Sequence, residues 1–147
     1  MPKGLVIFAT RTYQTQKIAQ FIAEGMRFEG YETVVMDVTG INKASMLDGY
    51  DAIVLGSATY HGEMLPSMKK FLFIAEKANL EGKAGGAFGA FGWSGEALER
   101  IFDTMKYILK MDMVPEPLRL KTAGIAGGTK MAQDYGREIA KKAVESK

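Results

Sequence analysis

Three closely spaced threonines follow the first apolar stretch of the chain. Residues 4–9 form a continuous apolar run of strand length, and Thr10, Thr12 and Thr15 come directly after it. A helix is predicted to begin at about Thr15, and free backbone N–H groups at a helix N-terminus favour an anion. The threonine hydroxyls add donors around that anion without adding charge. This segment therefore predicts a phosphate-binding loop, although one threonine alone would also serve as the helix N-cap.

Two later loops offer flat aromatic side chains. Tyr60 follows the apolar run 52–56, and Trp93, the single tryptophan, lies in the glycine-rich segment 91–96. The flanking glycines place Trp93 in a loop rather than on the periodic face of a helix, so its ring is predicted to stack on a planar ligand. The alternative is that each ring only covers the sheet end or joins the core. His61 titrates near neutral pH, but its position is also compatible with an exposed residue without a role.

The residues present exclude several other kinds of site. The loop after residues 4–9 has no Gly-x-x-x-x-Gly-Lys, no Gly-x-Gly-x-x-Gly and no acidic residue, which excludes a P-loop, a dinucleotide-binding turn and a phosphoacceptor site. The chain has no cysteine and one histidine, which excludes disulfides, thiolate sites and multi-histidine metal clusters. A mononucleotide with a planar ring, such as flavin mononucleotide (FMN), suits both the phosphate loop and the aromatic loops.

The composition is that of an ordinary globular protein. The chain has 147 residues, of which 47% are hydrophobic and 24% charged. Its formal charge of +2 is spread without a basic block, which gives no support for nucleic-acid binding. No apolar run approaches the ~20 residues that a membrane span needs, and the first residues do not resemble a signal segment. We therefore expect a cytoplasmic protein with no membrane or nucleic-acid partner.

Strand-like runs alternate with segments of helical periodicity. The predicted strands are residues 4–9, 33–38, 52–56, 83–90 and about 118–120, and the helical spacing covers residues 18–26, 66–75, 98–109 and 131–143. This alternation predicts an α/β fold, a parallel sheet covered by helices on both faces. Five units at this length fit one doubly wound domain, residues 1–147, with strand order 2-1-3-4-5. In that order the loops after strands 1, 3 and 4 meet at one site.

Three segments carry a resemblance to a known family. Thr10-x-Thr12-x-x-Thr15 is similar to the flavodoxin phosphate loop, and Gly56-Ser57-Ala58-Thr59, followed by Leu65-Pro66, is similar to the second loop of flavo-diiron proteins. Residues 91–97 resemble the third loop of those proteins and form the most specific of the three motifs. Along its whole length, the chain thus resembles flavodoxins, most closely the flavodoxin-like domain of flavo-diiron proteins (A-type flavoproteins).

The resemblance implies a set of FMN-binding residues. Trp93 would stack on the isoalloxazine, and Gln14 would join the three threonines at the phosphate, with no catalytic and no metal-ligating residue. The cofactor-binding residues implied in this way are Thr10, Arg11, Thr12, Tyr13, Gln14, Thr15, Ser57, Ala58, Thr59, Tyr60, His61, Gly62, Phe91, Gly92, Trp93, Ser94 and Gly95.

The sequence departs from the family pattern at three places in the phosphate loop and in its overall charge. Tyr13 stands where glycine is usual in the family and Gln14 where asparagine is usual, while Arg11 adds a cation beside the loop. Flavodoxins are typically strongly acidic, whereas this chain carries a formal charge of +2. It therefore lacks the negative field that would steer a carrier toward positively charged partners.

The resemblance implies a low-potential electron carrier that moves one or two electrons on non-covalently bound FMN. Its expected partners are redox proteins, among them a flavo-diiron protein or another oxidoreductase, and it is expected to be a monomer or a weak dimer. The alternative is an FMN-dependent oxidoreductase of the same fold. Segments 9–11 and 14–19 also resemble protoporphyrinogen oxidases, and segment 56–62 is also similar to quinone reductases. A third possibility, an interaction module without cofactor, is suggested by Tyr13.

Overall fold

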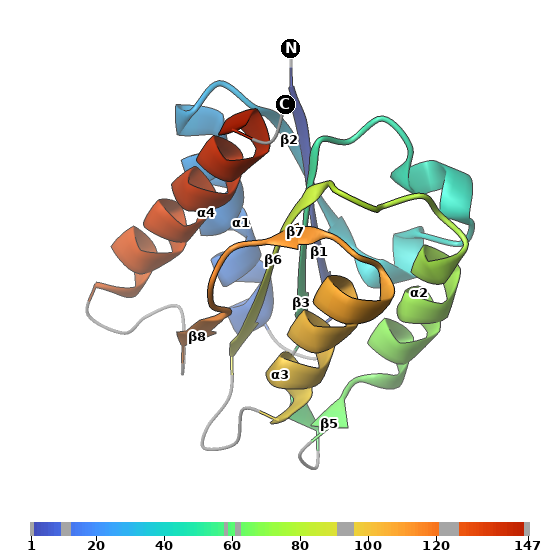
Figure 1. Ribbon diagram of the computed structural model, residues 1–147. Helices are drawn as coiled ribbons and strands as arrows, with labels where there is room; N and C mark the ends of the chain where they lie inside the picture. Colours follow the sequence, from blue (N-terminus) through green and yellow to red (C-terminus); the bar gives the residue numbers. More distant parts are fainter. Residues whose placement is uncertain are drawn as a thin grey trace.

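The centre of the fold is a parallel sheet (Figure 1). The computed structural model describes residues 2–9, 13–57, 59–60, 63–90, 96–120 and 127–145, without the side chains of residues 13, 14, 59, 60, 63, 64, 90, 96, 144 and 145. The strands of the sheet are β1 (Lys3–Ala9), β2 (Glu32–Asp37), β3 (Ala52–Ser57), β6 (Ala84–Ala90), β7 (Asp112–Met113) and β8 (Leu118–Leu120). They follow the order β2-β1-β3-β6-β7, with β8 also paired to β6, so the predicted doubly wound order is confirmed.

Four α-helices cover the sheet, two on each face. They are α1 (Tyr13–Phe28), α2 (Pro66–Glu76), α3 (Glu96–Asp103) and α4 (Gly128–Glu145). Alternate residues of β1 point to opposite faces, as the pleat requires. Leu5 and Ile7 pack in the core cluster that contains residues of α2 and α3, whereas Val6 and Phe8 pack in the cluster that contains residues of α1 and α4. In the described part of the chain, no helix is long and apolar enough to cross a bilayer.

The remaining elements are short. Two 3₁₀ turns, η1 (Val38–Gly40) and η2 (Ala44–Leu47), connect β2 to β3. A separate antiparallel pair, β4 (Thr59–Tyr60) and β5 (Glu63–Met64), lies between β3 and α2 and was not predicted from the sequence. A π-helical turn, η3 (Thr104–Ile108), continues α3.

Two residues expected on buried helical faces are exposed. Ile108 is 59% exposed, because the π turn changes the angular phase of the helix, whereas its neighbour Leu109, expected on the same face, is buried. Met131 is 47% exposed, because the next residue, Ala132, occupies the inward position of α4. The helix predicted to begin near Thr15 begins at Tyr13, and Gly30, at a φ of +88°, lies just beyond its end, as expected for a helix C-terminus.

The fifth strand is split, and a tyrosine hydroxyl fills the gap. β7 pairs with the start of β6 and β8 with its end, so Ala87 of β6 faces the interruption that contains Pro115. The hydroxyl of Tyr135 accepts a hydrogen bond from the Ala87 N–H (3.1 Å) and donates toward the carbonyls of Ala87 (3.1 Å) and Glu116 (2.9 Å). Burial raises the pKa of Tyr135, which keeps this hydroxyl protonated as a donor.

Two glycines bring α1 and α4 into backbone contact. A Cβ atom on Gly25 of α1 would overlap the carbonyl oxygen of Gln133 in α4, and a Cβ atom on Gly136 of α4 would overlap the carbonyl oxygen of Ile22 in α1. The obstructing atoms are backbone atoms, which no side-chain rotation can move away. Glycine is therefore required at both positions by the close approach of the helices.

We expect Gly25→Ala and Gly136→Ala each to lower the free energy of unfolding by about 3 kcal/mol, because the two helices must separate to admit a methyl group. The higher helix propensity of alanine offsets at most ~1 kcal/mol of this loss. Urea unfolding followed by circular dichroism measures the effect. The matched control is Gly40→Ala, whose new methyl would meet only the end of the Met36 side chain at 3.4 Å. Equal stabilities for all three variants would contradict the backbone contact.

We expect Tyr135→Phe to lower the free energy of unfolding by roughly 1–3 kcal/mol, because the buried Ala87 N–H then loses its acceptor. Tyr107→Phe is the control, since the Tyr107 ring is 65% exposed and its stacking with Lys106 survives loss of the hydroxyl. The same urea titration serves both variants. If the Tyr135 variant were as stable as the Tyr107 variant, the hydroxyl would not be replacing the missing strand.

Candidate functional site

The carboxyl ends of β1, β3 and β6 lie at one edge of the sheet. Ala9, the last residue of β1, is in register with Ser57, the last residue of β3, and Gly56 is in register with Phe88 near the end of β6. The three loops that the sequence singled out leave the sheet at this edge, at the lower side of Figure 1. The topology therefore brings the start of α1, the β4–β5 pair and the start of α3 to one place.

Many of the predicted site residues lie outside the described part of the chain. Those wholly outside it are Thr10, Arg11, Thr12, Ala58, His61, Gly62, Phe91, Gly92, Trp93, Ser94 and Gly95. Tyr13 and Gln14 are in the first turn of α1, and Thr59 and Tyr60 form β4, but the side chains of these four are not described. Thr15 and Ser57 are described in full, and their surroundings carry the structural argument.

Thr15 holds a buried hydroxyl at the start of α1. Its side chain is fully buried, and its Oγ1 has no hydrogen-bond partner among the described residues. A buried hydroxyl normally finds a partner, so one supplied by residues 10–12 or by a ligand is required here. The first turn of α1 contains no acidic residue, and its free N–H groups attract an anion. The helix end and the unsatisfied hydroxyl together fit a phosphate oxygen.

Ser57 connects the second loop to the sheet. Its side chain is buried, and its Oγ accepts a hydrogen bond from the backbone N–H of Leu65 (3.3 Å). Leu65 caps the N-terminus of α2, and Pro66 occupies the first helical position, where a missing N–H is harmless. The bond joins the end of β3 to the start of α2 and so closes the segment that contains the β4–β5 pair. Ser57 thereby holds the loop in which Tyr60 lies.

The backbone hydrogen bond of Ser57 could not be predicted from the sequence. A serine at the end of a strand, eight positions before a helix start, is compatible with either a ligand contact or a backbone contact. The hydrogen bond to Leu65 becomes visible only when the pairing of β4 with β5 folds the intervening chain back.

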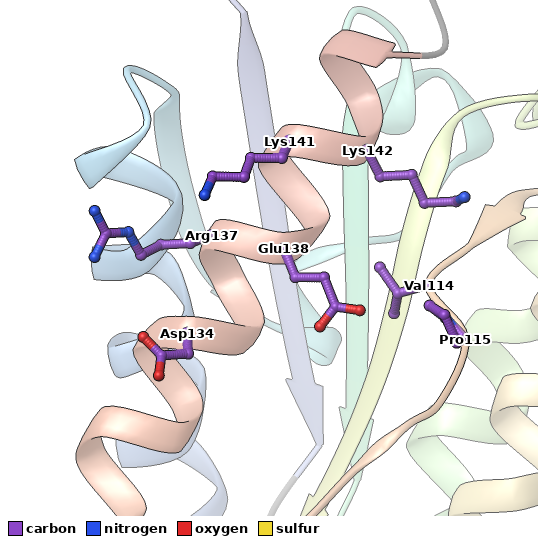
Figure 2. A pocket seen from close by; sticks show the side chains of 7 residues that line it. All are labelled: Val114, Pro115, Asp134, Arg137, Glu138, Lys141 and Lys142. Atoms are coloured by element: carbon purple, nitrogen blue, oxygen red, sulfur yellow. The ribbon is translucent and has the colours of Figure 1, made fainter.

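A surface pocket lies away from this edge of the sheet and is a weaker candidate for a functional site. It has a volume of about 670 Å³ and runs along α4. Figure 2 shows the Lys142 side chain on the side of the 114–115 segment and the Arg137 side chain on the opposite side of the helix. Lys142 forms an ion pair with Asp112, and Arg137 with Glu29. The charged groups therefore do not converge on one ligand. The pocket is lined by Val114, Pro115, Asp134, Arg137, Glu138, Lys141 and Lys142.

Within the described ranges, no group of three or more histidine, cysteine, aspartate or glutamate side chains is arranged to hold a metal ion. Among the described residues of the edge, Thr15 and the N-terminus of α1 offer hydrogen bonds from a hydroxyl and from backbone groups. Such groups bind and orient a ligand, and they leave any electron transfer to that ligand.

The family model for the flavodoxin domain matches residues 5–133. The type A flavoprotein FprA of Rhodobacter capsulatus is 33% identical over 144 residues, which cover 94% of this chain and 33% of the relative. A flavodoxin of Clostridium saccharobutylicum is 31% identical over 84 residues, covering 56% of this chain and 52% of the relative. This chain thus spans about a third of the length of the type A flavoprotein.

Solved structures of similar fold also include flavodoxins and flavodiiron proteins. An archaeal flavodoxin has a TM-score of 0.90 at 29% identity and covers 97% of this chain and 99% of its own. The flavodiiron protein of Giardia intestinalis has a TM-score of 0.88 at 26% identity, covering 98% of this chain and 36% of its own. The resemblance predicted from the three loops is confirmed.

We expect Thr15→Val to leave the free energy of unfolding of the ligand-free protein unchanged or to raise it by up to ~1 kcal/mol, because a buried unsatisfied hydroxyl is removed. Ser57→Ala is the matched contrast and should lower it by about 1–2 kcal/mol, since the Leu65 N–H loses its acceptor. Urea unfolding measures both. A loss for Thr15→Val as large as that for Ser57→Ala would mean that the protein itself satisfies the Thr15 hydroxyl.

Proposed function

Because the chain belongs to the flavodoxin family, we propose that it is an electron carrier that holds FMN without a covalent bond. The observation that carries the proposal is the buried, unsatisfied hydroxyl of Thr15 at the start of α1. It lies at the sheet edge where this topology binds ligands, on a helix end that favours a phosphate. The residues present therefore fit the phosphate end of the cofactor.

The chain itself binds and orients the cofactor. The first turn of α1 and the Thr15 hydroxyl would hold the phosphate, together with Thr10, Thr12 and Gln14. Ser57 would keep the second loop in place through its bond to Leu65. The 91–95 loop, with Trp93, would cover the ring. Residues 1–147 would form one FMN-binding domain.

FMN supplies the ability to accept and release one or two electrons. The protein contributes a fixed position, a hydrogen-bonding environment and exclusion of water from one side of the ring. No acid–base residue and no metal ligand is required for that role.

The relatives favour the carrier over an FMN-dependent enzyme of the quinone reductase type. The proposed partners are other redox proteins, an electron donor and an acceptor, among which a flavo-diiron protein is a candidate. We further propose that the carrier acts as a monomer or weak dimer in the cytoplasm. Turnover of NAD(P)H with a quinone by the purified protein would favour the enzyme instead.

We expect the purified protein to show flavin absorption bands or to acquire them with added FMN. Thr15→Val should weaken FMN binding about 10- to 100-fold, because a hydrogen bond to a charged phosphate is lost. Thr15→Ser should stay within about threefold of the original protein, since it keeps the hydroxyl. Fluorescence quenching of FMN measures the affinity.

Thr104→Val is the control for this titration, because its hydroxyl donates to the Arg100 carbonyl near the far end of α3. A protein that takes up no FMN would overturn the proposed function. Unchanged affinity in Thr15→Val would overturn the role of that residue alone.

A further inference from the structure

The charges around the cofactor edge are unevenly distributed. The edge comprises the last residues of β2 and β8 and the first seven residues of each helix, which all start at this side because helices in such a fold run antiparallel to the strands (Figure 1). Six of its described side chains are cationic: Lys17, Lys69, Lys70, Arg100, Arg119 and Lys130. Three are acidic: Asp37, Glu99 and Asp134. We call this set the cationic rim.

All three acids of the rim are engaged locally. Glu99 pairs with Arg119 (2.9 Å), and Asp134 pairs with Lys130 (3.1 Å). Asp37 accepts hydrogen bonds from the backbone N–H and hydroxyl of Thr39. Two of the three acids are thus paired with cations of the rim, whereas Asp37 keeps its negative charge. Six cations against three acids still leave an excess of positive formal charge.

The positive charge of the whole chain is concentrated at this edge. The rim carries a formal charge of +3 (six cations and three acids), against +2 for the entire chain, so the remainder carries −1. In the sequence, the flanking residues without described side chains add no net formal charge, since they comprise two cations, Arg11 and Lys121, and two acids, Glu63 and Glu96. The formal charge of the chain itself, before the negative charge of a bound phosphate is added, is therefore oriented with its positive end at the proposed cofactor site.

We propose that the redox partner of this protein docks at the cationic rim through a face rich in carboxylates around its own redox centre. This inference rests on the proposed function, because only an electron carrier needs its partner close to that edge. Complementary charge steers encounter and orients the two proteins so that their redox centres approach. A basic partner would be repelled from the same edge.

Lys17 and Lys70 allow the rim to be tested by charge reversal. Both are exposed, on α1 and α2 respectively. The double variant Lys17→Glu/Lys70→Glu removes positive charge from the rim. The matched control Lys77→Glu/Lys141→Glu makes the same change in total charge, at exposed positions near the opposite ends of α2 and α4.

The first measurement uses the reduced FMN-loaded protein and two small oxidants of opposite charge. Relative to Lys17→Glu/Lys70→Glu, the original protein should show a rate constant with ferricyanide that falls more steeply between ~0.01 M and ~1 M salt, where the Debye length shrinks from ~30 Å to ~3 Å. The rate with hexaammineruthenium(III) should rise over the same range. Both responses should flatten or reverse in Lys17→Glu/Lys70→Glu and persist in Lys77→Glu/Lys141→Glu. Equal responses in the two variants would overturn the proposal.

The second measurement needs no cofactor. A decaglutamate peptide, added at low salt to the ¹⁵N-labelled protein, should shift the amide signals of the first turns of α1, α2 and α4, and added salt should reverse the shifts. Shifts at the rim in a protein that binds no FMN would support the docking surface while the carrier function fails. Shifts spread evenly over the surface, or none, would overturn the docking surface while leaving FMN binding intact.

Discussion

One turn of α4, residues 133–136, connects the helix layer to the sheet and determines the geometry of the cofactor edge. Gly136 and Gln133 touch the backbone of α1, and Tyr135 between them hydrogen-bonds Ala87 of β6. Thr15 lies about 15 Å before Gly25 along α1 at a rise of 1.5 Å per residue. Because a helix is rigid over this distance, the contact of α1 with α4 sets where the Thr15 hydroxyl lies relative to the end of β6.

At this edge, different groups would bind the ligand and attract a partner. At its centre the described groups are uncharged, namely the hydroxyl of Thr15 and the N-terminus of α1, so a phosphate held there would keep most of its charge. The cations lie instead on the exposed sides of the helices, as Lys17 and Lys70 do. Uncharged groups bind by directed hydrogen bonds, which need exact placement of donor and acceptor. A surface charge acts at longer range and tolerates side-chain motion. This arrangement allows the protein to hold its ligand and attract a partner with different residues.

The sequence predicted what depends on local pattern and missed what depends on distant contacts. Strand runs and helical spacing were sufficient for the order β2-β1-β3-β6, because the central strands β1 and β3 are buried over almost their whole length. The role of Gly25 could not be predicted, since its obstructing partner, Gln133, belongs to a helix more than a hundred positions away. The fifth strand was predicted only at about residues 118–120, so neither β7 nor the hydroxyl of Tyr135 that fills the gap before β8 was predicted. At the candidate site, the place of Thr15 at the start of a helix was predictable from its spacing, whereas the bond from Leu65 to Ser57 was not.

The unsatisfied hydroxyl also links folding to binding. A buried polar group without a partner destabilises the ligand-free protein, and a ligand that supplies the partner removes that penalty only in the folded state. The N-terminus of α1 adds to this effect, because its free N–H groups are likewise satisfied by an anion. Under the proposed function, the start of α1 would therefore gain stability from the ligand, while the α1–α4 contact at Gly25 and Gly136 fixes the rest of the helix independently of it. The protein can thus keep the binding site formed before the cofactor arrives, so that little of the binding free energy goes into ordering the helix.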